Sequence, residues 1–465
     1  MPTTSTKRPR AELRCTECGW TTPKWVGRCG ECQAWGTIEE AGAAPARASV
    51  GALAPATPAA SILDVDVETA RARPTGVGEL DRVLGGGLVP GAVVLLAGEP
   101  GVGKSTLLLD VAARAASAVE GRVLYVTGEE SASQVRLRAE RIGALHEDLL
   151  LTAETDLATV LGHIEAMDPA LLVVDSVQTV ADSAVDGSAG GVSQVRAVAA
   201  TLIRAAKARA MPAMLVGHVT KDGSIAGPRV LEHLVDVVCQ VEGERHSRLR
   251  LVRAVKNRFG ATDEVGCFDL REDGIIGLPD PSGLFLSAAP EPVAGTCVTV
   301  TLEGRRPMPV EVQSLLTEPA GPPRRTVSGV DGARVAMMLA VLAARLEVGT
   351  AGKDVYVSTV GGARASEPAA DLALGLALLS ASLGRPVRPG VVAFGEVGLT
   401  GELRATTGVG RRLAEAARLG FTTAVVPSAG EAPANVAGIR VVRAANLAEA
   451  ARECGLGPSG SGADR

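Results

Sequence analysis

The sequence is poor in aromatic residues and in lysine. Only 3 Trp, 2 Tyr and 5 Phe occur among 465 residues, so a long aromatic platform for stacking nucleic-acid bases is not expected. Only seven of the 47 basic residues are Lys, which makes each Lys within a motif more informative than usual. The formal net charge of −5 excludes a globally basic coat, so any contact with nucleic acid must come from local patches.

Signals for export or membrane insertion are also missing. No charged stretch followed by an apolar run opens the chain, and no apolar run approaches the roughly 20 residues of a membrane span. We therefore expect a cytoplasmic protein without a membrane partner. With 46% hydrophobic residues the chain is globular, and its length predicts two or three domains.

One stretch fits a phosphate-binding loop, G-x-x-x-x-G-K-[ST], at every fixed position. An apolar run at 93–97 precedes it and a helical stretch follows, so backbone N–H groups at a helix N-terminus are expected to surround the phosphates. Lys104 is expected to reach the β and γ oxygens and Ser105 to hold Mg²⁺; an incidental glycine-rich turn is the alternative. The predicted nucleotide-binding residues are Gly98, Glu99, Pro100, Gly101, Val102, Gly103, Lys104, Ser105 and Thr106.

Polar residues follow three further apolar runs. Glu129 and Glu130 come after the strand-like run at 121–127, and a glutamate there is a candidate for polarising the attacking water. The alternative is that both glutamates favour the N-terminus of the next helix. Asp175 ends a second run and is expected to order Mg²⁺ through water, while His218 ends a third. The alternation of strands and helices predicts an α/β fold with a mostly parallel, doubly wound sheet.

The N-terminal region carries a metal-ligand pattern. Cys15 and Cys18 form one C-x-x-C knuckle, and Cys29 and Cys32 form a second after ten intervening residues. Four thiolates in two knuckles suit tetrahedral Zn²⁺. A pair of disulfides is the alternative, which is unfavourable in a reducing cytoplasm. All three tryptophans occur here beside basic residues. We interpret most of them as the small core of the module, with stacking on bases as the alternative; they are Trp20, Trp25 and Trp35.

The stretch 248–260 alternates apolar and polar residues. It predicts two strands around a turn, with Lys256, Asn257 and Arg258 at the tip. Composition alone would make this a solvated hairpin. The segment 181–194 is rich in Gly, Ser and Asp and predicts a mobile surface loop.

These features occur in the same order in the bacterial RadA (Sms) family. The four cysteines, the glycine-rich segment 75–91, the phosphate loop, the Asp175 strand and the pentapeptide KNRFG at 256–260 carry the resemblance, which covers residues 13–456. It implies a RecA-like ATPase of DNA repair and homologous recombination that uses ATP, Mg²⁺ and Zn²⁺. It further implies a homo-hexameric ring that binds single-stranded DNA, moves branched recombination intermediates and has RecA recombinase as a partner.

The resemblance also implies roles for single residues. Glu129 is similar to the glutamate that activates water, His218 to the γ-phosphate sensor and Asp175 to the Walker B acid. Lys256 and Arg258 are similar to the signature cations of the family, and they become candidates for catalysis and for contact with DNA.

The loop after the sensor strand supplies further candidates for DNA contact. Lys221 and Arg229 lie there. With few aromatics in the chain, we expect phosphate contacts to dominate and binding to weaken with salt.

Residues after 290 have their own strand and helix alternation and resemble the proteolytic domain of Lon proteases. That resemblance places Ala369 at the serine nucleophile and Gly410 at the lysine base, while Arg411 cannot act as a base near neutral pH. We expect an inert assembly platform. Its arginines either hold DNA or form an ordinary solvated face; they are Arg385, Arg388, Arg404, Arg411 and Arg412.

The predicted organisation has five parts. They are a four-Cys zinc module at 1–40, a flexible linker at 41–60, a RecA-like ATPase domain at 61–286, an inactive α+β Lon-protease-like domain at 287–456 and a disordered tail at 457–465. Three function classes stay open: a DNA-translocating recombination ATPase, an ATP-dependent Lon-like protease, and a scaffold or clock-type ATPase. The first accounts for the zinc module, the nucleotide core and the pentapeptide together.

Overall fold

The chain forms two compact units. The computed structural model describes residues 13–40, 61–64, 67–118, 121–218, 229–243, 248–287, 291–350, 352–430, 433 and 436–457. Unit 1 comprises Met1–Thr262 and Phe268–Gly277, and unit 2 comprises Asp263–Cys267 and Leu278–Arg465. The finer domain boundaries of the sequence analysis stay predictions. No helix in the described ranges is both long and apolar enough to cross a membrane.

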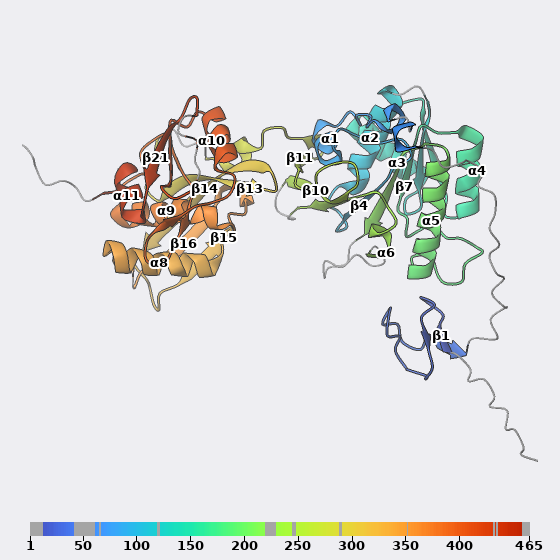
Figure 1. The fold of residues 1–465 in the computed structure, drawn as a ribbon, viewed down its shortest axis with the longest axis horizontal. Helices are drawn as coiled ribbons and strands as arrows, with labels where there is room; N and C mark the ends of the chain where they lie inside the picture. The colour runs from blue at the N-terminus through green and yellow to red at the C-terminus, as the bar shows by residue number, and fades with distance from the viewer. Residues whose placement is uncertain are drawn as a thin grey trace, which may run out of the picture. The chain divides into compact units, whose positions relative to one another are not determined.

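Unit 1 is built on a nine-stranded sheet (Figure 1). Its order is β12-β11-β10-β9-β4-β8-β7-β5-β6, and the six strands from β9 to β6 run parallel. The central strands are almost wholly apolar, as expected for a sheet covered on both faces. The strand bounds are β4 Val93–Gly98, β5 Val123–Thr127, β6 Leu149–Ala153, β7 Leu171–Asp175, β8 Ala213–His218, β9 Val237–Glu242, β10 Leu249–Asn257, β11 Val265–Arg271 and β12 Gly274–Gly277.

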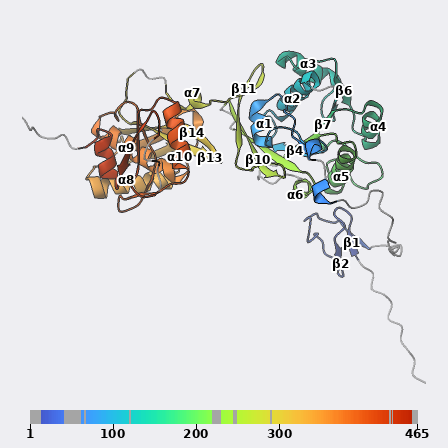
Figure 2. The ribbon, with the colours of Figure 1, turned by 45° about the horizontal axis from the view of Figure 1, so that its top comes forward.

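Helices cover both faces of this sheet (Figures 1 and 2). Apolar residues of α1, α2 and α3 pack on one face, and those of α4, α5 and α6 pack on the other. This is the predicted doubly wound α/β arrangement, which places the ligand-binding loops at the carboxyl ends of the parallel strands. The bounds are α1 Gly78–Leu84, α2 Lys104–Ala118, α3 Ala132–Ile142, α4 Leu157–Met167, α5 Val192–Ala208 and α6 Arg229–Glu232.

The KNRFG stretch begins at the end of β10 and enters the turn to β11, which is the neighbour of β10 in the sheet. Lys256 and Asn257 are the last residues of β10 and pair with Val238 and Val237 of β9. The side chain of Asn257 donates to the carbonyls of Val83 and Leu84 at the end of α1 (both 3.3 Å). The predicted pair of strands around a turn is thus confirmed, but the turn follows Asn257. Lys256 and Asn257 stay in the strand because their polar side chains bond to backbone carbonyls of neighbouring segments.

The loop from Asp182 to Gly191 is held by one side chain. Gln194, which is buried in α5, donates to the carbonyl of Asp182 (3.0 Å) and to that of Val185, and its own carbonyl accepts from the Asp182 N–H (2.9 Å). The loop lies at the surface, as predicted, and its mobility stays a prediction; the sequence did not reveal the Gln194 anchor. The loop follows β7, which carries Asp175.

Unit 2 contains a mixed seven-stranded sheet of order β15-β16-β14-β13-β17-β20-β21. Helices α8, α9 and α11 pack on one face and α10 packs on the other, so part of the second face stays open. The strands are β13 Thr296–Glu303, β14 Arg306–Thr317, β15 Arg325–Ser328, β16 Asp354–Thr359, β17 Val391–Ala393, β20 Thr423–Pro427 and β21 Arg440–Ala444. The helices are α7 Ser282–Phe285, α8 Gly332–Leu346, α9 Asp371–Leu383, α10 Val409–Arg418 and α11 Leu447–Glu453, and a hairpin joins β18 Glu396–Val397 to β19 Leu403–Arg404.

The N-terminal module is a small three-stranded sheet. The order is β2-β1-β3, and both neighbours pair antiparallel to β1. Its core holds the cysteine side chains with Ile38 and half-buried apolar neighbours. The bounds are β1 Leu13–Cys15, β2 Thr21–Thr22 and β3 Ile38–Glu40.

Candidate nucleotide site and metal centre

The phosphate-binding loop lies between β4 and α2, as the sequence predicts. Gly101 and Gly103 have positive φ angles of 83° and 100°, a conformation that glycine adopts at little cost. A Cβ on Gly98 would lie 2.7 Å from the Val241 carbonyl oxygen. The glycines are therefore required by backbone geometry, and α2 begins at Lys104 so that its N-terminus faces the loop.

Lys104 is buried at the floor of this loop, with 4% of its surface exposed. Its ammonium donates to the carbonyls of Gly98 (2.8 Å) and Glu99 (2.9 Å). Burial lowers the pKa of Lys104, and the nearby carboxylates of Asp175 and Glu129 partly oppose that shift. Since only neutral carbonyls hold the ammonium directly, its charge is available for a phosphate.

Glu129 is the glutamate that belongs to the site. Its Oε1 accepts from the Ser176 hydroxyl (2.6 Å) and lies 2.8 Å from His218 Nε2. Burial raises the pKa of Glu129, but the hydrogen bonds from Ser176 and His218 outweigh it, so the pKa falls below its ordinary value. Glu130 is instead paired with Arg138 of α3. The next residue, Ser131, caps that helix through a reciprocal bond with Gln134.

Asp175 has a partner that sequence reasoning missed. Asp175 ends β7, and its Oδ2 accepts from the Tyr125 hydroxyl at 2.8 Å. Tyr125 is fully buried on the neighbouring strand β5, and burial raises the pKa of its hydroxyl well above the ordinary value. The hydroxyl therefore stays protonated and donates, which fixes one carboxylate oxygen and leaves the other for a hydrated cation.

These residues fit a nucleotide with its magnesium ion. The glycine loop provides space for phosphates at a helix N-terminus, and Lys104 provides a cation held only by carbonyls. Ser105 and Asp175 are the residues that would hold Mg²⁺. His218 Nδ1 is buried without a partner among the described residues, on the ring that contacts Glu129. The candidate water-activating and sensing groups thus converge on the carboxyl ends of β5, β7 and β8.

Lys256 and Arg258 lie at the opposite ends of the parallel strands, near the amino-terminal end of β4. The Lys256 ammonium donates to the carbonyls of Glu232 (2.6 Å) and Val235 (2.7 Å), and Arg258 pairs with Asp236 (3.0 Å). Asp236 also accepts from the N–H of Val93, where β4 starts, whereas the phosphate loop begins where β4 ends. A strand of this length spans about 16 Å, so neither cation reaches the phosphate loop of its own chain.

Two predicted DNA-contact residues are not placed. Lys221 lies outside the described residues. Arg229 begins α6, but its side chain also lies outside the described part.

The four predicted zinc ligands converge. The sulfurs of Cys15, Cys18, Cys29 and Cys32 all lie within 4.8 Å of one another, with Cys15 to Cys32 at 3.7 Å and Cys18 to Cys29 at 3.5 Å. Zn–S bonds of about 2.3 Å in a tetrahedron place sulfurs about 3.8 Å apart. The site therefore fits Zn²⁺, and disulfides are not formed.

Two of the three tryptophans contradict the core interpretation. Trp20 packs beside the cysteines, whereas Trp25 is 66% exposed and Trp35 is 75% exposed. The metal site and a few aliphatic residues fill the module, so no interior space is left for two further indoles.

Several known protein families and proteins are similar to this chain. The rubredoxin metal binding domain family matches residues 14–40, the AAA domain family 56–224, and the family of subunit ChlI of Mg-chelatase 360–430. DNA repair protein RadA of Mycolicibacterium smegmatis is 56% identical over 448 residues, covering 94% of this chain and 95% of that protein. DNA repair protein RadA of Bacillus subtilis is 42% identical over 455 residues, covering 96% and 98%.

This chain belongs to the RadA family of DNA repair proteins. The resemblance noted in the sequence is thereby confirmed, as is the fold class with its ATPase core, zinc module and Lon-like region. As a RadA-family protein it carries an ATPase domain, which implies ATP and Mg²⁺, and a four-cysteine site that supports Zn²⁺.

The Lon-like region of this RadA-family chain holds a closed ion pair near Ala369, the position expected for the nucleophile. Ala369 is buried in the turn before α9. Glu367, two residues earlier, forms a two-pronged pair with the guanidinium of Arg412 from α10, including a bond of 2.8 Å. Arg412 also donates to the carbonyls of Thr407 (3.1 Å) and Val300. Because Arg412 is completely buried, the prediction that it belongs to the arginine-rich surface is wrong.

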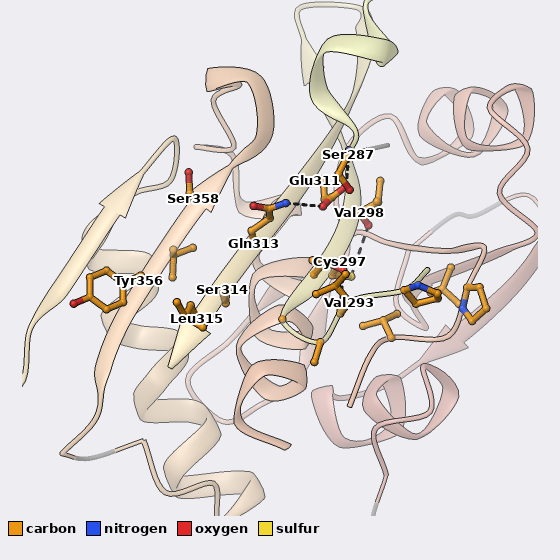
Figure 3. Close-up of a pocket in the computed structure, with 18 of the residues that line it drawn as sticks. Ser287, Val293, Cys297, Val298, Glu311, Gln313, Ser314, Leu315, Tyr356 and Ser358 are labelled. Atoms are coloured by element: carbon orange, nitrogen blue, oxygen red, sulfur yellow. Dashed lines mark hydrogen bonds between the residues drawn. The ribbon is translucent and has the colours of Figure 1, made fainter. Parts of the chain in front are cut away.

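A cavity of about 770 Å³ lies on the open face of the unit 2 sheet (Figure 3). Glu311 and Gln313 of β14 project toward it, and Glu311 accepts from Ser287 (2.7 and 2.8 Å) and Gln313 (2.9 Å). No lysine or histidine is among the described residues that line it. Its serines therefore have no lysine or histidine beside them there, and the carboxylate that faces one of them is that of Glu311, which accepts from the Ser287 hydroxyl.

Proposed function

We propose that this RadA-family protein is a DNA-dependent ATPase of homologous recombination and DNA repair. In this proposal a cytoplasmic homo-hexameric ring binds single-stranded DNA and drives branch migration of recombination intermediates as a ring helicase, with RecA recombinase as a partner. The observation that carries the proposal is the division of charged residues between the two edges of one sheet. The nucleotide groups lie at one edge, and the pentapeptide cations lie at the other.

The proposed catalytic roles follow from the contacts at the carboxyl edge. Lys104 neutralises charge on the transferred phosphoryl group, and Asp175 with Ser105 positions Mg²⁺. Glu129 accepts a proton from, or orients, the attacking water. His218 contacts Glu129 directly (2.8 Å), so a change at the γ-phosphate sensed by His218 also moves the group that activates water.

The cations at the other edge are proposed to act on the nucleotide of a neighbouring subunit. Ring ATPases place nucleotides between subunits, and a cation supplied in trans stabilises transition-state charge. Arg258 is the better placed of the two, because its side chain is 51% exposed, whereas two carbonyls satisfy the Lys256 ammonium. Lys256 then positions the strand end, or couples the interface to DNA.

A subunit-mixing experiment tests the trans role. Arg258→Ala chains and Glu129→Gln chains are each expected to be nearly inactive alone. In mixtures, an intact Glu129 of one chain meets an intact Arg258 of its neighbour, so activity should reappear. If no mixing ratio restores hydrolysis, Arg258 does not act in trans.

Contact with DNA is proposed to rest mainly on phosphates, with Lys221 and Arg229 as candidates. Binding of single-stranded DNA should then fall with salt, with a slope of about −0.7 per phosphate contact. Movement of a branched DNA junction by the wild-type chain, and its loss in Lys104→Ala, tests the ring-helicase proposal. An unmoved junction in the presence of active ATP hydrolysis would limit the function to a DNA-dependent ATPase.

The Lon-like region is proposed to be a non-proteolytic platform. Alanine at the nucleophile position and glycine at the base position leave no acyl-transfer machinery. The remaining candidate arginines, without Arg412, are proposed as a DNA-binding face. The ordinary solvated alternative stays open for Arg404, which pairs with Glu402 (2.6 Å) and Glu396 (3.4 Å).

A further inference from the structure

The zinc module exposes two large aromatic side chains. Trp25 and Trp35 are 66% and 75% exposed, in a chain that has only three tryptophans. A tryptophan side chain offers one of the largest areas for burial, and exposed tryptophans mark binding surfaces. Neither residue contributes to the core of the module.

The two indoles both lie close to Gly27. An ideal Cβ on Gly27 would lie 3.8 Å from the six-membered ring of Trp25 and 3.8 Å from that of Trp35. Both rings therefore lie within van der Waals distance of the same backbone position. Both rings belong to one continuous patch.

The zinc knuckle fixes the orientation of Trp35. Arg28 and Trp35 form an antiparallel bridge on either side of the Cys29 to Cys32 knuckle. The Arg28 Nε donates to the Gln33 carbonyl at 3.0 Å, and its guanidinium carbon lies 5.7 Å from the centre of the Trp35 ring. The arrangement is preorganised, so a ligand meets little ordering cost.

Two exposed cations flank the first indole. Lys24 and Arg28 are both exposed and no acidic residue occurs from 21 to 29, while Glu31 is the one carboxylate between Arg28 and Trp35. Aromatic rings interleaved with exposed cations are the chemistry that binds single-stranded nucleic acid, because bases stack on the rings and phosphates pair with the cations. An apolar peptide would not use these charges.

We propose that Trp25 and Trp35, with Arg28 and Lys24, form a stacking platform for unpaired bases of single-stranded DNA. This inference rests on the proposed DNA-binding function and assigns part of it to the zinc module. The scarcity of aromatics elsewhere in the chain makes this module the site where base stacking is concentrated. The low aromatic content thus excludes a long platform but not a local one.

The composition provides a direct readout. All three tryptophans belong to the zinc module, so the intrinsic tryptophan fluorescence of the full chain reports on this module alone. Titration of the zinc-loaded chain with an oligothymidylate should quench the emission. An abasic oligomer with the same number of phosphates should leave the emission nearly unchanged.

Substitutions separate stacking from structure. Trp25→Ala and Trp35→Ala should each weaken binding of the oligothymidylate roughly 5- to 100-fold, the stacking contribution of one base. The corresponding Phe variants should retain most of the affinity. Trp20→Phe is the matched control, because Trp20 packs beside the cysteines; it should leave DNA affinity unchanged while zinc content stays constant.

The failures of the two proposals are distinguishable. Unchanged fluorescence at DNA concentrations that stimulate ATP hydrolysis would overturn the stacking platform and keep the proposed function. Equal affinity of the Ala variants and the wild type would also overturn it and point to a protein partner for the indoles. Absence of both DNA binding and DNA-stimulated hydrolysis would reject the proposed function, and the platform with it.

Discussion

Two buried cations, one in each unit, occupy similar local positions and have opposite surroundings. Lys104 begins α2 after a glycine-rich loop, and Arg412 lies in the first turn of α10 after Gly408. Lys104 is held by two carbonyls. Arg412 is held by the carboxylate of Glu367 as well as by carbonyls.

The difference shows how a buried charge indicates either function or packing. A buried charge without a bonded counter-charge is costly, and a ligand of opposite charge relieves that cost. A buried charge that is paired and fully hydrogen-bonded has no such demand, and removing one partner is destabilising. Lys104 therefore marks a ligand site, and Arg412 marks a closed structural pair.

Substitution of Lys104 is expected to have the largest effect on activity. In Lys104→Ala the developing phosphoryl charge loses its cation, so ATP hydrolysis should fall by a factor on the order of 10²–10³ or more. Measurement of phosphate release checks this. The melting temperature should change little, because no ion pair is broken. Near wild-type hydrolysis would contradict the assignment of this site.

Substitution of Arg412 should have the converse outcome. Arg412→Ala removes a completely buried side chain and leaves the half-buried Glu367 carboxylate without its partner, so unit 2 should lose about 3 kcal/mol of unfolding free energy. Denaturant unfolding measures this loss. The exposed neighbour Arg411 is the matched control, and Arg411→Ala should stay within about 0.5 kcal/mol of the wild type. Equal effects at the two positions would rule out the closed pair.

The Tyr125 hydroxyl should increase the affinity of the nucleotide site for Mg²⁺ through its bond to Asp175. Tyr125→Phe removes the 2.8 Å bond to the carboxylate, and an outer partner of a metal-binding group is worth on the order of 10-fold in metal affinity. We expect a higher Mg²⁺ concentration for half-maximal hydrolysis and weaker Mg²⁺-dependent nucleotide binding. Tyr356→Phe is the control, since Tyr356 is the only other tyrosine of the chain. An identical Mg²⁺ dependence of the two variants would show that Tyr125 only packs.

The smallest expected effect is a shift in pH dependence. Glu129 must be ionised to act on water, so activity is lost as the pH falls through its pKa, which lies below the ordinary value. Ser176→Ala removes one bond that stabilises the carboxylate and should move the acid limb of the pH–rate profile upward by less than about one unit. A downward shift would contradict the contacts assigned to Glu129.

The sequence predicts those parts of the site that are local. The phosphate loop and the cysteine knuckles are contiguous patterns, so their geometry follows from spacing. The pattern could not choose between Glu129 and Glu130, because the choice depends on Ser176 and Arg138 in other elements. Tyr125 was missed because its partner is 50 residues away. A tyrosine in an apolar strand is predicted to be an ordinary core residue.

Burial in unit 2 and in the zinc module was harder to predict. Arg412 looks like a surface residue because its partner Glu367 is 45 residues away. Trp25 and Trp35 look like core residues because a small module needs apolar area, yet the metal site meets part of that need. In each case the deciding contact is between segments that are distant in sequence.

The most direct test of the account measures two reactions in one sample of the full chain. Phosphate release from ATP and cleavage of casein are followed with and without single-stranded DNA. We predict that DNA increases phosphate release and that casein stays intact under all conditions. ATP-dependent cleavage of casein, with phosphate release insensitive to DNA, would contradict it and favour the Lon-like protease.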